Sequence, residues 1–204
     1  NIVLGLSPKN TLEHYVNDAC LIEDILLKAP GGIEIIPGAT GIGDFIQLSI
    51  QQQKKLVNGI KQLESKFDYI VIDTGAGISD ALIQFLLAAP YVVITITQEP
   101  TSLTDAFSLL KVLKRQNFNA PVFVIVNMAR DISSAHETYQ RFKAAVKKYI
   151  DLDVYYLCFI FSDPTVPSSI RAQKPFLLAH PESLASHCLK NASLRLSQAL
   201  EKKS

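Results

Sequence analysis

Tyr69-Ile70-Val71-Ile72-Asp73-Thr74-Gly75-Ala76-Gly77-Ile78 is an apolar run that ends in an acid and continues into a turn with two glycines. Such a run predicts a parallel strand that is buried on both faces, because strands of this kind are nearly continuous in apolar residues. In open α/β sheets, ligands bind in the crevice at the carboxyl ends of the strands. The stretch therefore predicts an α/β fold with a binding site at the end of residues 69–73.

The residues at the end of this run indicate the chemistry of the site. Asp73 is placed to hold a water bound to Mg²⁺, an ion that takes one or two protein carboxylates and keeps several waters. Gly75 and Gly77 would let backbone amides approach a terminal phosphate, and would let the turn move when that phosphate leaves. The alternative is an ordinary buried strand followed by a turn.

Composition sets the class of protein. A chain of 204 residues with 48% hydrophobic and 19% charged residues can bury one sizeable core, which predicts a single soluble globular domain over residues 1–204. The net charge of +1 gives no overall field that favours nucleic acid or an anionic membrane. Cys20, Cys158 and Cys188 are far apart, which suits reduced thiols in a cytoplasm and fits neither a disulfide framework nor a metal site.

Short β-branched runs alternate with longer amphipathic segments along the chain. Strands are expected at residues 33–36, 69–73, 91–97, 122–127 and 155–161. Helices are expected at residues 46–65, 80–89, 102–116, 134–150 and 183–203. This alternation predicts a mostly parallel sheet with right-handed crossovers and with helices on both faces.

Two further segments suggest a nucleotide base. Asn127 ends the apolar run 122–127, and its amide offers a donor and an acceptor that match the N6 and N7 edge of adenine. The alternative for Asn127 is a helix or turn cap. Residues 161–170 read as a proline-bounded loop that could wall the base and offer it backbone groups.

Four segments together resemble the MinD/ParA deviant-Walker ATPases, and within them the FlhG (YlxH, FleN) regulators of flagellar number. They are residues 35–42 (IIPGATGI), 72–79 (IDTGAGIS), 98–106 (QEPTSLTDA) and 126–128 (VNM). Thr-Gly-Ala-Gly after Ile72 and Asp73, with Glu-Pro-Thr-Ser after the next strand, favours the flagellar branch over MinD proper and ParA. The resemblance runs along nearly the whole chain and implies a P-loop NTPase-like fold of the SIMIBI class.

The resemblance implies an ATP-dependent switch with Mg²⁺ as its metal ion. In this family, ATP joins two subunits, the dimer engages partners, and hydrolysis releases it. The implied partner is the flagellar GTPase FlhF, and the implied location is the cytoplasm, with peripheral association to the inner membrane through a segment not seen in this chain. Nucleic acid is not favoured as a partner.

The roles of single residues follow by position in the family motifs. Asp73 would serve Mg²⁺ through water, and the turn formed by Thr74, Gly75 and Gly77 would sense the γ-phosphate. Glu99 is a weaker candidate at the sheet edge. The residues that would bind adenine are Asn127, Asp163, Pro164, Thr165 and Val166.

The chain departs from the family pattern in its phosphate-binding residues. These ATPases carry a glycine-rich loop with two lysines after the first strand and a catalytic Asp near the end of the second, and both are expected upstream of Asn1. No GKT or GKS occurs in the chain. Without that loop the phosphate charges are not neutralised, so residues 1–204 are not expected to hydrolyse ATP. We therefore expect an incomplete domain whose central strand is missing and whose neighbouring strands have unpaired backbone groups.

Two alternatives to the flagellar function remain open. A MinD- or ParA-type ATPase of cell division or DNA partition would be favoured by a membrane-binding tail or a basic DNA-binding face. A non-catalytic partner-binding module would be favoured if the intact protein lacks the phosphate-loop lysine. An iron–sulfur carrier is disfavoured because its cluster needs paired bridging cysteines at fixed spacing.

Overall fold

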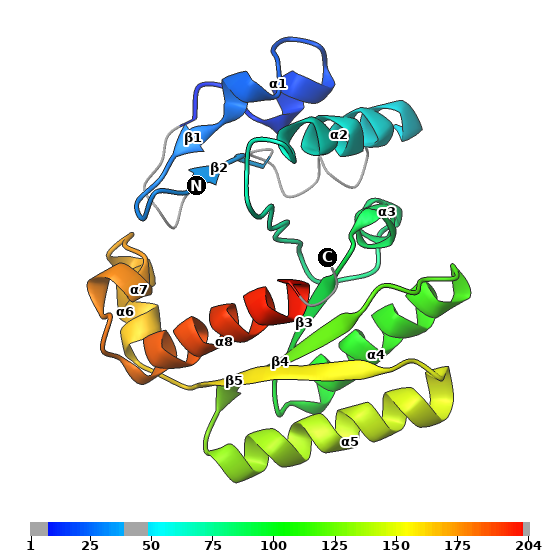
Figure 1. The fold of residues 1–204 in the computed structure, drawn as a ribbon, viewed down its shortest axis with the longest axis vertical. Coiled ribbons are helices and arrows are strands. Elements are labelled where there is room, and N and C mark those ends of the chain that lie inside the picture. Colours follow the sequence, from blue (N-terminus) through cyan, green and yellow to red (C-terminus); the bar gives the residue numbers. More distant parts are fainter. Residues whose placement is uncertain (1–7, 39–48, 202–204) are drawn as a thin grey trace. The chain divides into compact units, whose positions relative to one another are not determined.

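A computed structural model of the protein describes residues 8–38 and 49–201. The chain divides into two compact units, residues 1–88 with 171–175 and residues 89–170 with 176–204. Each unit has its own elements, labelled in Figure 1. That residues 1–204 form one domain stays a prediction.

The second unit is built on a three-stranded parallel sheet in the order β3-β4-β5. The strands are Val92–Ile96 (β3), Val122–Ala129 (β4) and Val154–Phe161 (β5). Their first residues are in register, because Val92 pairs with Val122 and Val122 pairs with Val154. The sequence prediction of a parallel sheet is therefore confirmed for these three strands.

Helices flank this sheet, as the alternation of the sequence predicts. Pro100–Arg115 (α4) and Ile132–Ile150 (α5) lie on one side of it, and Leu184–Glu201 (α8) lies on the other, against β5 (Figure 1). The start of α5 is fixed by Asp131, whose side chain accepts a hydrogen bond from the Ser134 amide at 2.8 Å. The α/β class is thus confirmed.

The first unit consists of short elements around a small apolar core. Leu12–Val16 (α1), Ile50–Leu63 (α2) and Asp80–Ala88 (α3) are α-helices, and Glu23–Ile25 (η2) is a 3₁₀ turn. The two-residue strands Leu27–Lys28 (β1) and Glu34–Ile35 (β2) pair antiparallel. The start of the predicted helix 46–65 lies outside the described residues. The core is formed by Tyr15, Val16, Ile22, Ile25, Leu56 and Leu63.

The predicted buried strand at residues 69–73 is wrong for this structure. These residues belong to no strand, and the side chains of Tyr69 and Val71 are 57% and 87% exposed. The apolar pattern is local, whereas a strand also needs a neighbour that pairs with its backbone and layers that cover both faces. In the part of the chain that the structure describes, no strand pairs with residues 69–73.

The predicted loop at residues 161–170 is also only partly correct. The helix Thr165–Arg171 (α6) begins within it, and the single turn Phe176–Ala179 (α7) follows. The physical reason is that Asp163 and Pro164 are the residue types that begin helices, at the cap and at the first turn.

Among residues 8–38 and 49–201, no helix is both long and apolar enough to cross a membrane.

Candidate functional site

The carboxyl ends of the three parallel strands bring several predicted residues to one edge of the second unit. Glu99 is the exposed N-cap residue of α4, just after β3, while Asn127 lies near the end of β4. The loop that starts at Ser162 follows β5, and its first amide donates a hydrogen bond to the Ala129 carbonyl at 3.0 Å. The base-binding residues predicted at separate points of the sequence thus share one edge of the sheet.

Asn127 lies in an irregular part of β4. Val126 pairs with Phe159 and Ala129 with Phe161, so two residues of β4 face one residue of β5. This is the pattern of a β-bulge, a device that redirects a side chain at the end of a strand. The N-cap of the following helix is Asp131, so Asn127 does not cap it. The half-buried Asn127 amide is therefore left at the sheet edge.

Met128, the next residue of this edge, has a backbone conformation that the sequence does not reveal. Its φ is 54°, in the left-handed region that residues other than Gly, Asn and Asp rarely adopt. Its amide donates a hydrogen bond to Oδ1 of Asn127 at 2.9 Å. A methionine gives no signal for this conformation, so only the structure shows the left-handed backbone at this position.

Asp163 joins the starts of two helices. One carboxylate oxygen, Oδ1, accepts hydrogen bonds from the amide and the hydroxyl of Thr165, at 2.9 and 2.6 Å, at the start of α6. The other oxygen, Oδ2, accepts from the Ala185 amide at 3.1 Å, at the start of α8. These bonds, first that from the Thr165 hydroxyl and then that from Ala185, hold the pKa of Asp163 below its usual value. Both oxygens of Asp163 therefore have partners inside the protein.

The rest of the predicted base-binding loop forms the first turn of α6. The Val166 amide donates to the Asp163 carbonyl at 3.2 Å, and the Thr165 amide is bonded to the Asp163 side chain. Pro164 has no amide hydrogen to offer. The amides of Thr165 and Val166 are thus used within the turn. The turn can therefore contact a base through its surface and its side chains, Pro164 and Val166 among them.

The predicted phosphate-sensing residues lie in the first unit, between α2 and α3. Asp73, Thr74, Gly75 and Gly77 are all exposed. Gly77 has a φ of 120°, which requires glycine, whereas a Cβ built on Gly75 would meet nothing within 4 Å. Within the described ranges no three His, Cys, Asp or Glu side chains gather as a metal site. The Mg²⁺ and phosphate roles of these residues stay predictions.

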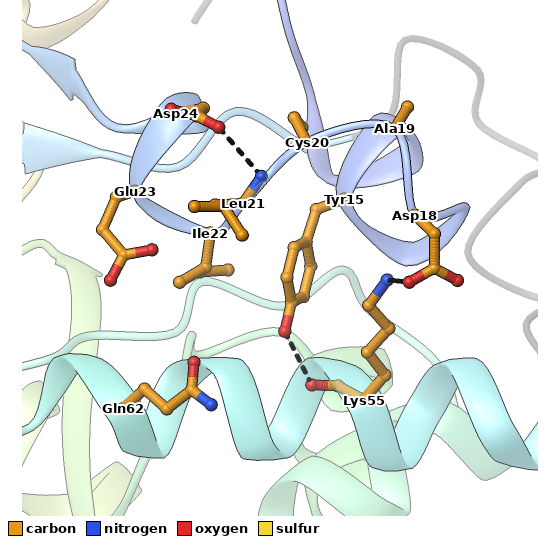
Figure 2. Close-up of a pocket in the computed structure, with 10 residues that line it drawn as sticks. All are labelled: Tyr15, Asp18, Ala19, Cys20, Leu21, Ile22, Glu23, Asp24, Lys55 and Gln62. Carbon is orange, nitrogen blue, oxygen red and sulfur yellow. Dashed lines mark hydrogen bonds and ion pairs between the residues drawn. The ribbon is translucent and has the colours of Figure 1, made fainter.

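A hollow of about 440 Å³ with a mixed polar and apolar lining lies elsewhere in the first unit, formed by residues 18–24 with Tyr15, Lys55 and Gln62 (Figure 2). The Tyr15 hydroxyl donates to the Lys55 carbonyl at 3.1 Å. The Lys55 ammonium pairs with Asp18 and lies 4.8 Å from the centre of the Tyr15 ring. Burial raises the pKa of Tyr15. None of the site residues predicted from the sequence lines this hollow.

Comparison with known proteins identifies the family. The AAA domain family matches residues 5–121, more than half of the chain. The antiactivator FleN of Pseudomonas aeruginosa is 32% identical over 190 residues, which are 93% of this chain and 68% of FleN. The chain belongs to the MinD/ParA family of ATPases. The resemblance stated from the sequence motifs is thereby confirmed.

Further relatives of this MinD/ParA-family protein agree with the assignment. The flagellum site-determining protein YlxH of Helicobacter pylori is 26% identical over 211 aligned positions, covering 98% of this chain and 68% of YlxH. The cell division ATPase MinD of Pyrococcus furiosus superposes with a TM-score of 0.76 at 21% identity, covering 97% of this chain and 80% of that protein. MinD of Pyrococcus horikoshii, solved with Mg-ADP, gives 0.75 at 24% identity, covering 100% and 80%. The fold is thus MinD-like.

Proposed function

We propose that this protein is an ATP-dependent dimerisation switch that regulates flagellar number or placement together with the flagellar GTPase FlhF. The similarity to FleN and YlxH, an antiactivator and a flagellum site-determining protein, supports this branch of the family. The observation that carries the nucleotide part is the Asn127 amide, which stands half-buried at the bulged end of β4 and offers an acceptor and a donor side by side. These two groups fit the N6 and N7 edge of adenine.

The same proposal assigns the remaining residues of the ATP site. Asp163 positions the turn that walls the base, because its carboxylate holds the starts of α6 and α8. Asp73 serves Mg²⁺ through water, and the turn from Thr74 to Gly77 responds to the γ-phosphate. The φ of 120° at Gly77 supports a turn of special shape at this point. Mg²⁺, when bound, would neutralise phosphate charge.

The apolar segment 69–72 supports the expectation that the complete domain contains a further strand. Tyr69, Val71 and Ile72 are exposed although a strand of this composition is normally covered on both faces. A neighbouring parallel strand would pair with the backbone of this segment and cover its side chains. We propose that this strand leads into the phosphate loop, and that residues 1–204 alone do not hydrolyse ATP.

Two further properties belong to the proposed switch. The ATP-bound form is a homodimer, and it associates peripherally with the inner-membrane surface from the cytoplasm through a segment outside this chain. Both properties are carried over from the family. Sedimentation of the full-length protein with lipid vesicles, with Mg-ATP and with Mg-ADP, tests them together with light scattering for the dimer.

The experiment that tests the function compares Asn127→Ala with Asn119→Ala in the full-length protein. Asn119 is exposed and precedes β4, at the opposite end of the strand from Asn127, so it serves as a matched control. Calorimetric titration with Mg-ATP is expected to show binding weakened by roughly 5- to 150-fold in Asn127→Ala, the value of one bidentate contact to a base. Asn119→Ala should bind like the wild type.

The biological part is tested by deleting the gene and counting flagella per cell by electron microscopy. The expected result is a changed number or position of flagella that the gene with Asn119→Ala restores and the gene with Asn127→Ala does not. Misplaced septa or lost plasmids with normal flagella would move the function to cell division or DNA partition. A full-length protein that binds no ATP would refute the switch and leave a partner-binding module.

A further inference from the structure

The side chain of Asn127 is held in one orientation by the backbone of the next residue. The Met128 amide donates to Oδ1 of Asn127 at 2.9 Å. A backbone N–H can only donate, so the atom that faces it must be the amide oxygen. Rotating the side-chain amide by half a turn would set its NH₂ group against this N–H. The hydrogen bond therefore fixes which end of the Asn127 amide is oxygen and which is nitrogen.

The bulge in β4 keeps the Met128 amide in this position. Regular pairing resumes on both sides of it, at Val126 with Phe159 and at Ala129 with Phe161. The Ala129 carbonyl also accepts from the Ser162 amide at 3.0 Å. Met128 adopts a φ of 54° between these fixed points, and such a conformation persists only where the surroundings impose it. Residues in strained backbone conformations cluster at ligand-binding and active sites.

We propose that the Met128 backbone, by fixing the Asn127 amide, makes the site select purines with a 6-amino group over purines with a 6-oxo group. The inference rests on the proposed ATP site and adds its means of discrimination. Oδ1 keeps one lone pair for a donor on the base, and Nδ2 keeps its hydrogens for N7. Adenine presents N6–H₂ and N7, which match these two groups, whereas a 6-oxo purine sets an acceptor, O6, against Oδ1.

The hydrogen bond from the Met128 amide to Oδ1 of Asn127, called the lock below, matters because an unrestrained Asn side chain can bind both 6-amino and 6-oxo purines. A free side chain can turn until its NH₂ group lies between O6 and N7, with its oxygen directed elsewhere. The Asn127 amide cannot make this turn while Oδ1 is bonded to the Met128 amide. Met128 is thus a positioning residue, which acts through Asn127 and through its backbone and not through its side chain.

The test measures competition by ATP and by inosine triphosphate, which differ at the 6-position of the purine, in the full-length protein. The wild type is expected to prefer ATP by roughly 5- to 150-fold, the discrimination of one bidentate amide contact. Met128→Ile should move the ratio of the two dissociation constants toward one, because a β-branched residue does not tolerate the left-handed region. Met128→Asn should keep the ratio, because Asn adopts this region readily.

A second measurement needs no nucleotide. Hydrogen exchange of the Met128 amide, followed by NMR, should be slow in the wild type and in Met128→Asn, measured there at residue 128. It should be faster in Asn127→Ala, because the acceptor is removed. This readout also shows that the variants are folded, since the amides of β4 and β5 must stay protected in all of them.

The outcomes separate this inference from the proposed function. A ratio that collapses in Met128→Ile and is kept in Met128→Asn supports the lock. An unchanged ratio in folded Met128→Ile, with a collapsed ratio in Asn127→Ala, would overturn the lock while leaving base recognition by Asn127. Equal binding of the two nucleotides by the wild type would overturn the selection itself. Absence of any nucleotide binding would instead refute the ATP switch.

Discussion

Replacing Gly59 by Ala tests the packing of the first unit. Gly59 lies inside α2 and is buried against Tyr15, a core side chain that is 7% exposed. A Cβ built on Gly59 would press on the Tyr15 hydroxyl and would lie 2.8 Å from Cζ and 3.0 Å from Cε1. The ring must therefore move, and its hydrogen bond to the Lys55 carbonyl, one helical turn before Gly59, must lengthen or break.

The expected sign comes from comparing three contributions to the free energy of unfolding. Removing Gly from the interior of a helix stabilises by about 1 kcal/mol. Overpacking a closed core costs about 1–3 kcal/mol, and the loss of the tyrosine hydrogen bond costs about 1 kcal/mol more. The cost outweighs the gain, so Gly59→Ala should destabilise by about 1–3 kcal/mol. This is a large share of a domain's total stability, which is about 5–15 kcal/mol.

The assay is urea unfolding followed by circular dichroism. Asn58→Ala, at an exposed position of the same helix, is the matched control and should be neutral or stabilise slightly. In a Tyr15→Leu background, which lacks both Cζ and the hydroxyl, Gly59→Ala should become neutral or stabilising. The reasoning is refuted if Gly59→Ala stabilises the wild type, or if its effect is the same in both backgrounds.

Three further predictions concern the rest of the chain. Asp163→Ala should lower the free energy of unfolding by about 1–2 kcal/mol, because one carboxylate caps α6 and α8, and Asp163→Asn should lose less. The folded pKa of Asp163 lies below its usual 3.8, so the wild type should exceed Asp163→Asn in free energy of unfolding by the full amount near pH 7. This difference should decrease as the pH drops below about 4. Urea titrations that find the difference undiminished at pH 2 would contradict this. Burial raises the pKa of the Cys158 thiol to about 11, so iodoacetamide at pH 8 should label the partly exposed Cys20 and Cys188 first, as peptide mass spectrometry would show; equal rates at all three would contradict this. Residues 1–204 alone should release no phosphate from Mg-ATP above the buffer rate, while the full-length protein should, and turnover by the shorter chain would overturn the proposed need for the phosphate loop.

Sequence patterns predicted the elements that pair or pack within the chain. The runs at β3, β4 and β5 are correct because each finds a neighbouring strand and a covering helix among the described residues. Residues 69–73 have the same kind of pattern, but the pattern cannot report whether a partner strand is present. The prediction failed there because no partner strand lies beside residues 69–73 in the described part of the chain, although their composition favours a strand.

The candidate site was predictable only in part for a similar reason. Asn127 at the end of an apolar run was a recognisable signal, and the structure places it at the sheet edge. The role of Asp163 at the base stays a prediction, since Asp-Pro-Thr is also a helix start and the structure gives the Asp163 carboxylate to two helices. Met128 entered the sequence analysis only as part of residues 126–128, and its left-handed φ could not be predicted because methionine rarely adopts that conformation.

The carboxylate of Asp163 has a mechanical consequence. It accepts hydrogen bonds from the first turns of both α6 and α8, so a shift of either helix at that end strains its bond to the other. A displacement of the start of α6 by about an ångström would stretch the hydrogen bond between Asp163 and the Ala185 amide at α8 beyond its useful range. The start of α8 is thereby coupled mechanically to the turn that follows β5.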